Sequence, residues 1–255
     1  MHFKNIGIAT EEGIGTLTLN RPEKLNAINS GTWREIDSAF EEFGKDDYVK
    51  AVVVTGKGKA FSAGGDLEEM SGFEHHSAWD FAILAHRVLS RIENFPKPVI
   101  AAINGFALGA GNEIAMACDF RIASKAAKFG HPEVKIGIPP GAGATIRLPH
   151  FVGAAKAKEM IYTGKIITAQ EALEIGLADR IAADPVKEAK LLARQMLENS
   201  LSAIANAKML INKFASIDEA KTMAEIRAFA KAFGTPDQKE GMRAFLEKRK
   251  PRFGK

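Results

Sequence analysis

The chain has 255 residues, of which 46% are hydrophobic and 26% charged, the balance of a soluble globular protein with a sizeable core. Its single cysteine, Cys118, excludes an internal disulfide and a multi-cysteine zinc site, and its apolar surroundings favour a buried thiol. The longest charge-free run, residues 99–112, is too short to span a bilayer, and no signal peptide is visible. We therefore expect a cytoplasmic protein, or a matrix protein that lacks its transit peptide. The net charge of +4 permits a polyanionic ligand, but no nucleic-acid recognition motif is present.

The first half of the sequence predicts alternating strands and helices. Residues 3–10 and 15–20 are rich in β-branched side chains and predict a hairpin. Ser30 is expected to cap a helix over residues 31–43, with Trp33, Ile36, Phe40 and Phe43 on one face. Residues 51–55 and 99–103 are continuous apolar runs, typical of strands buried on both faces. A long helix is predicted over residues 78–94, where Pro96 and Pro98 end it.

Two glycine-rich loops, residues 56–65 and 105–111, each follow a buried strand and lead into a helix. The second helix is expected to begin at Asn112 or Glu113. Backbone N–H groups at a helix start lack intrahelical partners, and the helix dipole adds positive potential there. Two such turns that converge would form an oxyanion hole from backbone alone. The alternative is that the glycines only permit tight turns. A third glycine cluster, residues 137–143, ends this part of the chain.

From about residue 151 onwards, helical patterns dominate. Apolar residues recur at helical spacing and either complete the core of the monomer or pack against other subunits; the second reading is favoured. These residues are Met209, Leu210, Phe214, Met223, Ile226, Phe229, Ala230 and Phe233. We therefore divide the chain into an α/β core with the active site, residues 1–195, and a C-terminal helical oligomerisation region, residues 196–255.

Several common sites are absent from the sequence. It contains no Gly-x-Ser-x-Gly elbow, no Walker A motif and no His-Glu-x-x-His motif. The neighbouring His75 and His76 are expected in an exposed loop rather than at a metal. A metal or nicotinamide enzyme is therefore not expected.

Two acidic residues lie beside the glycine-rich loops. Glu113 stands in an apolar stretch where burying a carboxylate is costly, and Glu133 precedes the third glycine cluster. The alternatives are that Glu113 only stabilises the first turn of its helix and that Glu133 is an ordinary loop carboxylate. Two acids near an oxyanion hole indicate general acid–base chemistry on a carbonyl compound, with crowding that drives their pKa values apart.

In combination, these segments resemble the crotonase (enoyl-CoA hydratase/isomerase) superfamily, and most of all an enoyl-CoA hydratase. The similarity covers essentially the whole chain and is carried by residues 20–27, 60–70, 104–113, 130–143 and 240–250. It implies a spiral of ββα turns followed by a helical trimerisation region, and a homotrimer or dimer of trimers. It also implies an acyl-CoA thioester substrate, with CoA as part of the substrate and no separate cofactor.

The resemblance also assigns roles to single residues. It places the oxyanion-hole amides at Gly65 and Ala110, the two catalytic glutamates at Glu113 and Glu133, and a water-positioning N–H at Gly141. It implies that the CoA ester is bound by Lys24, Leu25, Ala27, Ala63, Asp66 and Leu67, and that Phe245 and Lys248 reach the CoA of a neighbouring subunit.

Both glutamates favour a hydratase, which adds water to trans-2-enoyl-CoA and gives 3-hydroxyacyl-CoA. An isomerase, a CoA-ester hydrolase or a decarboxylase of the superfamily would use the same oxyanion hole. Two alternatives belong to other classes of protein: an RNA-binding protein and a purely structural acyl-CoA-binding protein. Four positions depart from common family residues and bear on acyl-chain preference: Gly65, Ala110, Asn112 and Ile146.

Overall fold

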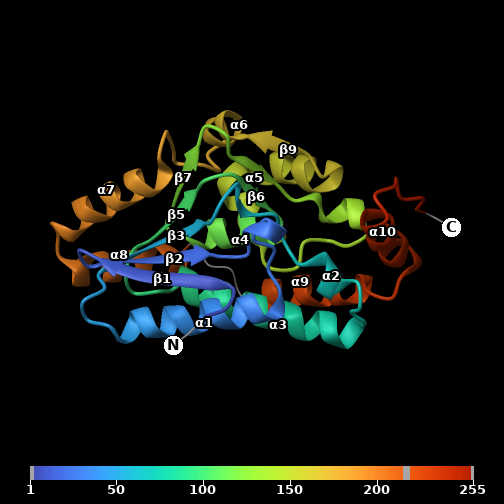
Figure 1. The fold of residues 1–255 in the computed structure, drawn as a ribbon, viewed down its shortest axis with the longest axis horizontal. Coiled ribbons are helices and arrows are strands. Elements are labelled where there is room, and N and C mark those ends of the chain that lie inside the picture. The colour runs from blue at the N-terminus through green and yellow to red at the C-terminus, as the bar shows by residue number, and fades with distance from the viewer. Residues whose placement is uncertain (1–2, 215–218, 254–255) are drawn as a thin grey trace.

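The computed structural model describes residues 3–214 and 219–253, which wind through two sheets (Figure 1). The six-stranded sheet has the order β1-β2-β3-β5-β7-β10. Its strands are Ile6–Glu11, Ile14–Leu19, Ala51–Gly56, Val99–Ile103, Phe120–Ser124 and Arg180–Ala182. The four-stranded sheet has the order β4-β6-β8-β9. Its strands are Ala60–Ser62, Phe106–Leu108, Lys128–Gly130 and Ile166–Thr168.

From β3 to β8, consecutive strands alternate between the two sheets, and a helix closes each turn of the spiral. β3 and β4 precede α2, β5 and β6 precede α4, and β7 and β8 precede η2. The α-helices are Ser30–Lys45, Leu67–Met70, His75–Glu93, Ala110–Ala117, Ala144–Thr163, Ala169–Glu174, Pro185–Leu197, Leu201–Phe214, Glu219–Ala232 and Pro236–Leu246, for α1 to α10. The 3₁₀ helices η1 and η2 are Pro22–Lys24 and Pro132–Ile136. The expected ββα spiral is confirmed.

The predicted strands are confirmed within a few residues. β1 and β2 form the antiparallel hairpin, while β2, β3, β5, β7 and β10 run parallel. Every residue of β3 and β5 is buried, as expected of parallel strands covered on both faces. Figure 1 shows α1 and α3 along the lower side of the sheet and α7 at the upper left.

Three helices, α1, α3 and α4, begin earlier than predicted. α1 begins at Ser30, because the side chain of Asn29, not of Ser30, accepts the N–H of Thr32 at 2.8 Å. α3 begins at His75, so the prediction of a loop at His75 and His76 is wrong, although both side chains are exposed.

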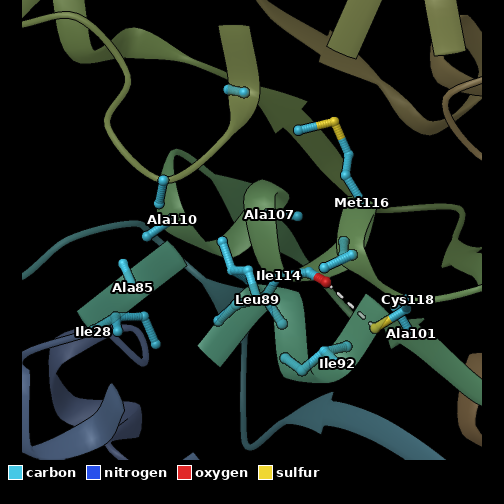
Figure 2. Close-up of a cluster of buried hydrophobic side chains, with 14 of the residues drawn as sticks. Ile28, Ala85, Leu89, Ile92, Ala101, Ala107, Ala110, Ile114, Met116 and Cys118 are labelled. Carbon is cyan, nitrogen blue, oxygen red and sulfur yellow. Dashed lines mark hydrogen bonds between the residues drawn. The ribbon is translucent and has the colours of Figure 1, made fainter. Parts of the chain in front are cut away.

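Helix α4 lies at the centre of the molecule and is buried along its whole length. It begins at Ala110, not at Asn112 or Glu113, because Gly109 adopts φ 49° and ψ −123° and turns the chain into the helix. Figure 2 shows Ile114 of α4 among Leu89 and Ile92 of α3, and the thiol of Cys118 donates to the carbonyl of Ile114 at 3.3 Å. Cys118 is a buried thiol, as expected.

The C-terminal helices divide into two kinds. α9 packs against α3, and its apolar face completes the core of the monomer through Ile226, Phe229, Ala230 and Phe233. Met223 is partly buried beside them. In α8, by contrast, Met209, Leu210 and Ile211 are exposed. The side chain of Phe214 lies outside the described residues. The proposed boundary between residues 195 and 196 falls inside α7, which packs against β3, β5 and β7; the division stays a prediction.

Candidate active site

A cavity of about 1070 Å³ opens beside the start of α4. Every site residue predicted from the sequence lines it. These are Lys24, Leu25, Ala27, Ala63, Gly65, Asp66, Leu67, Ala110, Glu113, Glu133, Gly141, Phe245 and Lys248.

The first two glycine-rich loops meet at this cavity. A Cβ atom added to Gly64 would lie 3.1 Å from the carbonyl oxygen of Leu108, and one added to Gly109 would lie 3.6 Å from Cα of Gly64. The residues that follow, Gly65 and Ala110, have backbone N–H groups with no acceptor among the described residues. Two unpaired donors therefore lie at the meeting point of the loops, which is the arrangement an oxyanion hole requires.

Gly65 stands where the family commonly has alanine, and the side chain of Met70 occupies the adjacent space. A Cβ atom there would lie 2.6 Å from the sulfur of Met70, and a small shift of this flexible side chain would relieve the contact. Met70 lines the same cavity. The glycine therefore leaves space for a thioether in the wall of the cavity.

Glu113 lies on α4, and the backbone at the start of α5 holds its carboxyl. Its side chain is buried, and its Oε1 accepts the N–H groups of Ala142 and Ala144, each at 2.9 Å. Burial raises the pKa of the carboxyl well above its usual value, and the neighbouring charges of Glu133 and Glu225 raise it further; the two backbone hydrogen bonds oppose the shift. Oε1 alone makes these bonds, so Oε2 is left for a ligand in the cavity.

Glu133, on η2, projects toward the same place. Its Oε1 lies 3.6 Å from Nδ1 of His131, and a Cβ atom on Gly109 would be 3.0 Å from that oxygen. His131 is fully buried, and its Nε2 lies 3.0 Å from Nδ2 of Asn112. Oε2 of Glu133, Nδ1 of His131 and Oδ1 of Asn112 are all buried without a partner among the described residues. A row of unsatisfied polar atoms thus runs from α4 to the second acid.

The chain is similar to curated enoyl-CoA hydratases over nearly its full length. The family model "Enoyl-CoA hydratase/isomerase" matches residues 9–255. A short-chain-enoyl-CoA hydratase of Clostridium acetobutylicum is 44% identical, with 98% of this chain and 97% of that protein covered. A crotonyl-CoA hydratase of Syntrophomonas wolfei is also 44% identical, with 99% of each covered.

The chain belongs to the enoyl-CoA hydratase/isomerase family. Solved structures agree with the assignment. An enoyl-CoA hydratase from Mycobacterium avium subsp. paratuberculosis K-10 superposes with a TM-score of 0.89 at 29% identity, covering 100% of both chains. One from Bacillus anthracis gives a TM-score of 0.81 at 34% identity, covering 98% of this chain and 99% of the other. The resemblance inferred from the sequence motifs is therefore confirmed.

Within this family member, Gly141 is confined by an aromatic ring. A Cβ atom on Gly141 would lie 2.1 Å from Cδ2 of Phe229, which also lines the cavity. The bonds to Glu113 come from Ala142 and Ala144, the neighbours of Gly141, and not from Gly141 itself. The water-positioning role of Gly141 stays a prediction.

The opposite end of the cavity is polar and partly open. Asp66 caps α2 and forms an ion pair with Arg21 at 2.8 Å, while Lys24 pairs with Glu68 at the surface. Leu25, with φ 50°, presents an exposed apolar side chain beside them. The lining therefore contains the lysines Lys24 and Lys248 and the exposed Leu25, which match the charges and flat apolar groups of a CoA moiety.

Phe245 and Lys248 line the cavity of their own chain, and the expectation that they reach the CoA of a neighbouring subunit stays a prediction. Their position follows from the close packing of α10 on η2. A Cβ atom on Gly137 would lie 2.5 Å from the carbonyl oxygen of Asp237, and one on Gly241 would lie 2.6 Å from the backbone of Ile136. This contact places the end of α10 over the cavity, at the right of Figure 1.

The sequence motifs did not identify the apolar wall of the cavity. Trp33, Met70, Phe81, Ile138 and Phe229 all contribute to it. Trp33 and Phe229 were expected only on apolar helix faces, because helical spacing shows that a residue is buried but not what it is buried against. No signal in a single sequence separates these residues from the rest of the core.

Residues 3–214 and 219–253 contain no cluster of three or more His, Cys, Asp or Glu side chains that could hold a metal ion. Within the same described part of the chain, no helix is sufficiently long and apolar to span a membrane.

Proposed function

We propose that the chain is an enoyl-CoA hydratase that adds water to short-chain trans-2-enoyl-CoA and forms 3-hydroxyacyl-CoA. One observation carries the proposal: the carboxyls of Glu113 and Glu133 enter a single cavity at the point where the unpaired N–H groups of Gly65 and Ala110 meet. The two relatives at 44% identity, one named a short-chain-enoyl-CoA hydratase and the other a crotonyl-CoA hydratase, support both the hydration and the short chain.

In the proposed mechanism, the thioester oxygen accepts hydrogen bonds from the N–H groups of Gly65 and Ala110. These bonds polarise the conjugated double bond and stabilise the negative charge that develops on oxygen when water attacks Cβ. Each backbone donor of this kind contributes roughly 10²–10³ in rate.

The two glutamates handle the protons of the added water. One carboxyl, in its ionised form, orients the water and accepts one proton, the oxygen bonds to Cβ, and the other, in its protonated form, supplies the proton that Cα receives; Glu113 and Glu133 share these two roles. The water therefore ends as a hydroxyl on Cβ and a hydrogen on Cα, and a proton shared between the carboxyls restores the starting state. General acid–base help of this kind is worth roughly 10²–10⁴ in rate.

The decisive experiment is the hydration of crotonyl-CoA, followed by the loss of the ultraviolet absorbance of the enoyl thioester. We expect rapid loss with the wild type, accumulation of 3-hydroxybutyryl-CoA, and a drop of roughly 10²–10⁴ in kcat for Glu133→Gln. Glu174→Gln, at an exposed position on α6, is the matched control and should retain wild-type kcat. A shifted alkene or a free acid as the product would assign the cavity to an isomerase or a hydrolase instead.

We further propose that the enzyme assembles as a homotrimer or a dimer of trimers through its C-terminal helices, works without a metal or redox cofactor, and is cytoplasmic. The exposed apolar residues of α8 support the assembly, because apolar patches on a surface mark interaction sites. Backbone donors and carboxyls suffice for the chemistry. Cell fractionation with an antibody against the chain would test the location.

A further inference from the structure

The start of α5 lies between two carboxylates. Four successive backbone N–H groups, those of residues 142–145, point alternately to its two sides. The N–H groups of Ala142 and Ala144 donate to Glu113, as described above, whereas those of Gly143 and Thr145 donate to the carboxylate of Glu225. Gly143 has φ 108°, in the region that favours glycine, and this turn allows neighbouring N–H groups to face opposite ways.

Glu225 reaches this turn from α9. Its side chain is buried and has further partners: the hydroxyl of Thr145 donates to it, and Nε2 of His86 on α3 lies 3.0 Å away. The N–H of Thr145 lies 2.9 Å from its Oε1. The residue does not line the substrate cavity, in contrast to Phe229 one turn further along α9. Glu225 therefore holds the turn from behind, while Glu113 holds it from the cavity side.

The carbonyl side of the same turn is also fixed. Nη1 of Arg147 donates to the carbonyl of Ala142 at 3.4 Å, and Arg147 forms an ion pair with Glu93 at 2.8 Å. The four N–H groups of the turn and the carbonyl of Ala142 are therefore all hydrogen-bonded. These bonds fix the turn in the orientation in which Ala142 and Ala144 donate toward the cavity. A buried carboxylate is costly unless its hydrogen bonds are complete, and those of Glu225 come chiefly from this turn.

We propose that Glu225 is a positioning residue for the hydration reaction: by orienting the start of α5, it aims the two N–H groups that fix the carboxyl of Glu113. The inference rests on the proposed role of Glu113. The negative charge of Glu225 also raises the pKa of Glu113.

The test compares Glu225→Gln with a matched carboxylate elsewhere. The glutamine has the same size but replaces one acceptor oxygen with an NH₂ group, so it cannot accept from both Gly143 and Thr145. Glu35 is the control because it also accepts two backbone N–H groups, from Lys4 at 3.0 Å and Asn5 at 2.7 Å, and lies on α1 outside the cavity lining.

The measurements are kcat and KM with crotonyl-CoA and the Kd of the unreactive butyryl-CoA. We expect Glu225→Gln to lower kcat about 100-fold, because a misplacement of about 1 Å costs that much, with KM and Kd changed less than about threefold. Glu35→Gln should keep wild-type kcat. Wild-type kcat in Glu225→Gln, or losses of kcat and of butyryl-CoA binding that run in parallel, would overturn the inference.

Thr145→Val provides a second test that removes only the hydroxyl bond to Glu225. We expect a severalfold loss of kcat with an unchanged Kd for butyryl-CoA, and an unchanged kcat would contradict the proposal. Failure of the wild type itself to hydrate crotonyl-CoA would reject the proposed function instead. The two failures are therefore distinguishable.

Discussion

Nδ2 of Asn112 lies 3.0 Å from Nε2 of His131. An amide nitrogen can only donate, so Nε2 is the acceptor and the ring proton sits on Nδ1, which faces Oε1 of Glu133 at 3.6 Å. That separation is longer than a hydrogen bond, and catalytic contacts often shorten when substrate binds. Asn112 thus selects the histidine tautomer that turns a donor toward the second acid.

Two substitutions of His131 separate this role from simple packing. Asparagine places its amide nitrogen near the position of Nδ1, whereas glutamine reaches the position of Nε2. We expect His131→Gln to lower kcat by up to about 10-fold, since a hydrogen bond contributes about 0.5–1.5 kcal/mol, and His131→Asn to retain most of the activity. Steady-state kinetics with crotonyl-CoA decide the matter. The reverse order of the two variants would show that the contact with Asn112 matters and the one with Glu133 does not.

The ring of Phe229 should limit the length of the acyl chain. It lines the cavity and leaves no room for a side chain at residue 141. Phe229→Leu removes part of the wall, and we expect kcat/KM for octenoyl-CoA to rise severalfold relative to crotonyl-CoA.

The matched control for this prediction is Phe233→Leu. Phe233 lies four residues after Phe229, directly after the end of α9, with its ring 5.1 Å from that of Phe229, and is buried in the core but does not line the cavity. Both variants lose similar packing. An equal change of chain preference in both would assign the effect to general loosening of the core.

Because the pKa of Glu113 is raised in the folded state, ionisation of this carboxyl destabilises the folded protein. Below about pH 4.5 this carboxyl is protonated in the folded and unfolded states alike. Above that pH the unfolded chain releases the proton more readily, so the folded state loses stability as the pH rises toward the raised pKa. Glu113→Gln should therefore melt higher than the wild type at pH 8, by about 2–4 °C for each kcal/mol, and show a smaller difference at pH 4.5.

Thermal melts across this pH range, with Glu174→Gln as the control, measure the effect. Glutamine keeps the oxygen that accepts the N–H groups of Ala142 and Ala144, so the comparison isolates the charge. A melting difference that is constant across the range would contradict the assignment of the cost to ionisation.

Residues of α8 should carry subunit contacts. Lys208 and Asn212 tie one side of the helix to the body through Asp119 and Glu93, while Ile211 is 67% exposed. We expect the wild type, with chains of 27.6 kDa, to run at about 83 kDa or a multiple of it in light scattering, and Ile211→Glu to shift it toward the monomer. A monomeric wild type would reject the assembly.

Chelation should leave the activity unchanged. The proposed mechanism uses only backbone N–H groups and two carboxyls, so dialysis against EDTA should alter kcat for crotonyl-CoA by less than the error of the assay. Restoration of a lost activity by added metal would contradict this prediction.

The sequence predicted those parts of the site that depend on local patterns. Continuous apolar runs identified β3 and β5, and the glycine-rich turns after them, with Glu113 directly behind, predicted two loops and one acid that the structure brings to the same cavity. The start of α4 was misplaced because the conformation of Gly109 depends on its contact with Gly64, more than 40 residues away in the sequence. Local propensity cannot report such a contact.

The side chains that bind the start of α5 could not be predicted from the sequence, for a similar reason. Glu225 is 82 residues from Gly143 and His86 is 139 residues from Glu225, so only the packing of α9 on α3 brings them together. In the sequence, Glu225 is one charged residue in a helix with many. The apolar face of α9 could be predicted, but whether it met its own chain or another could not.

The end of α10 also bears on how the enzyme is made. Residues 241–251 supply one wall of the cavity, and they are synthesised after both glycine-rich loops and both glutamates. A nascent chain can thus carry both loops and both acids and still lack a closed cavity. A chain that stops before residue 241 keeps the two carboxyls but lacks this wall, so the complete site forms only after these residues leave the ribosome.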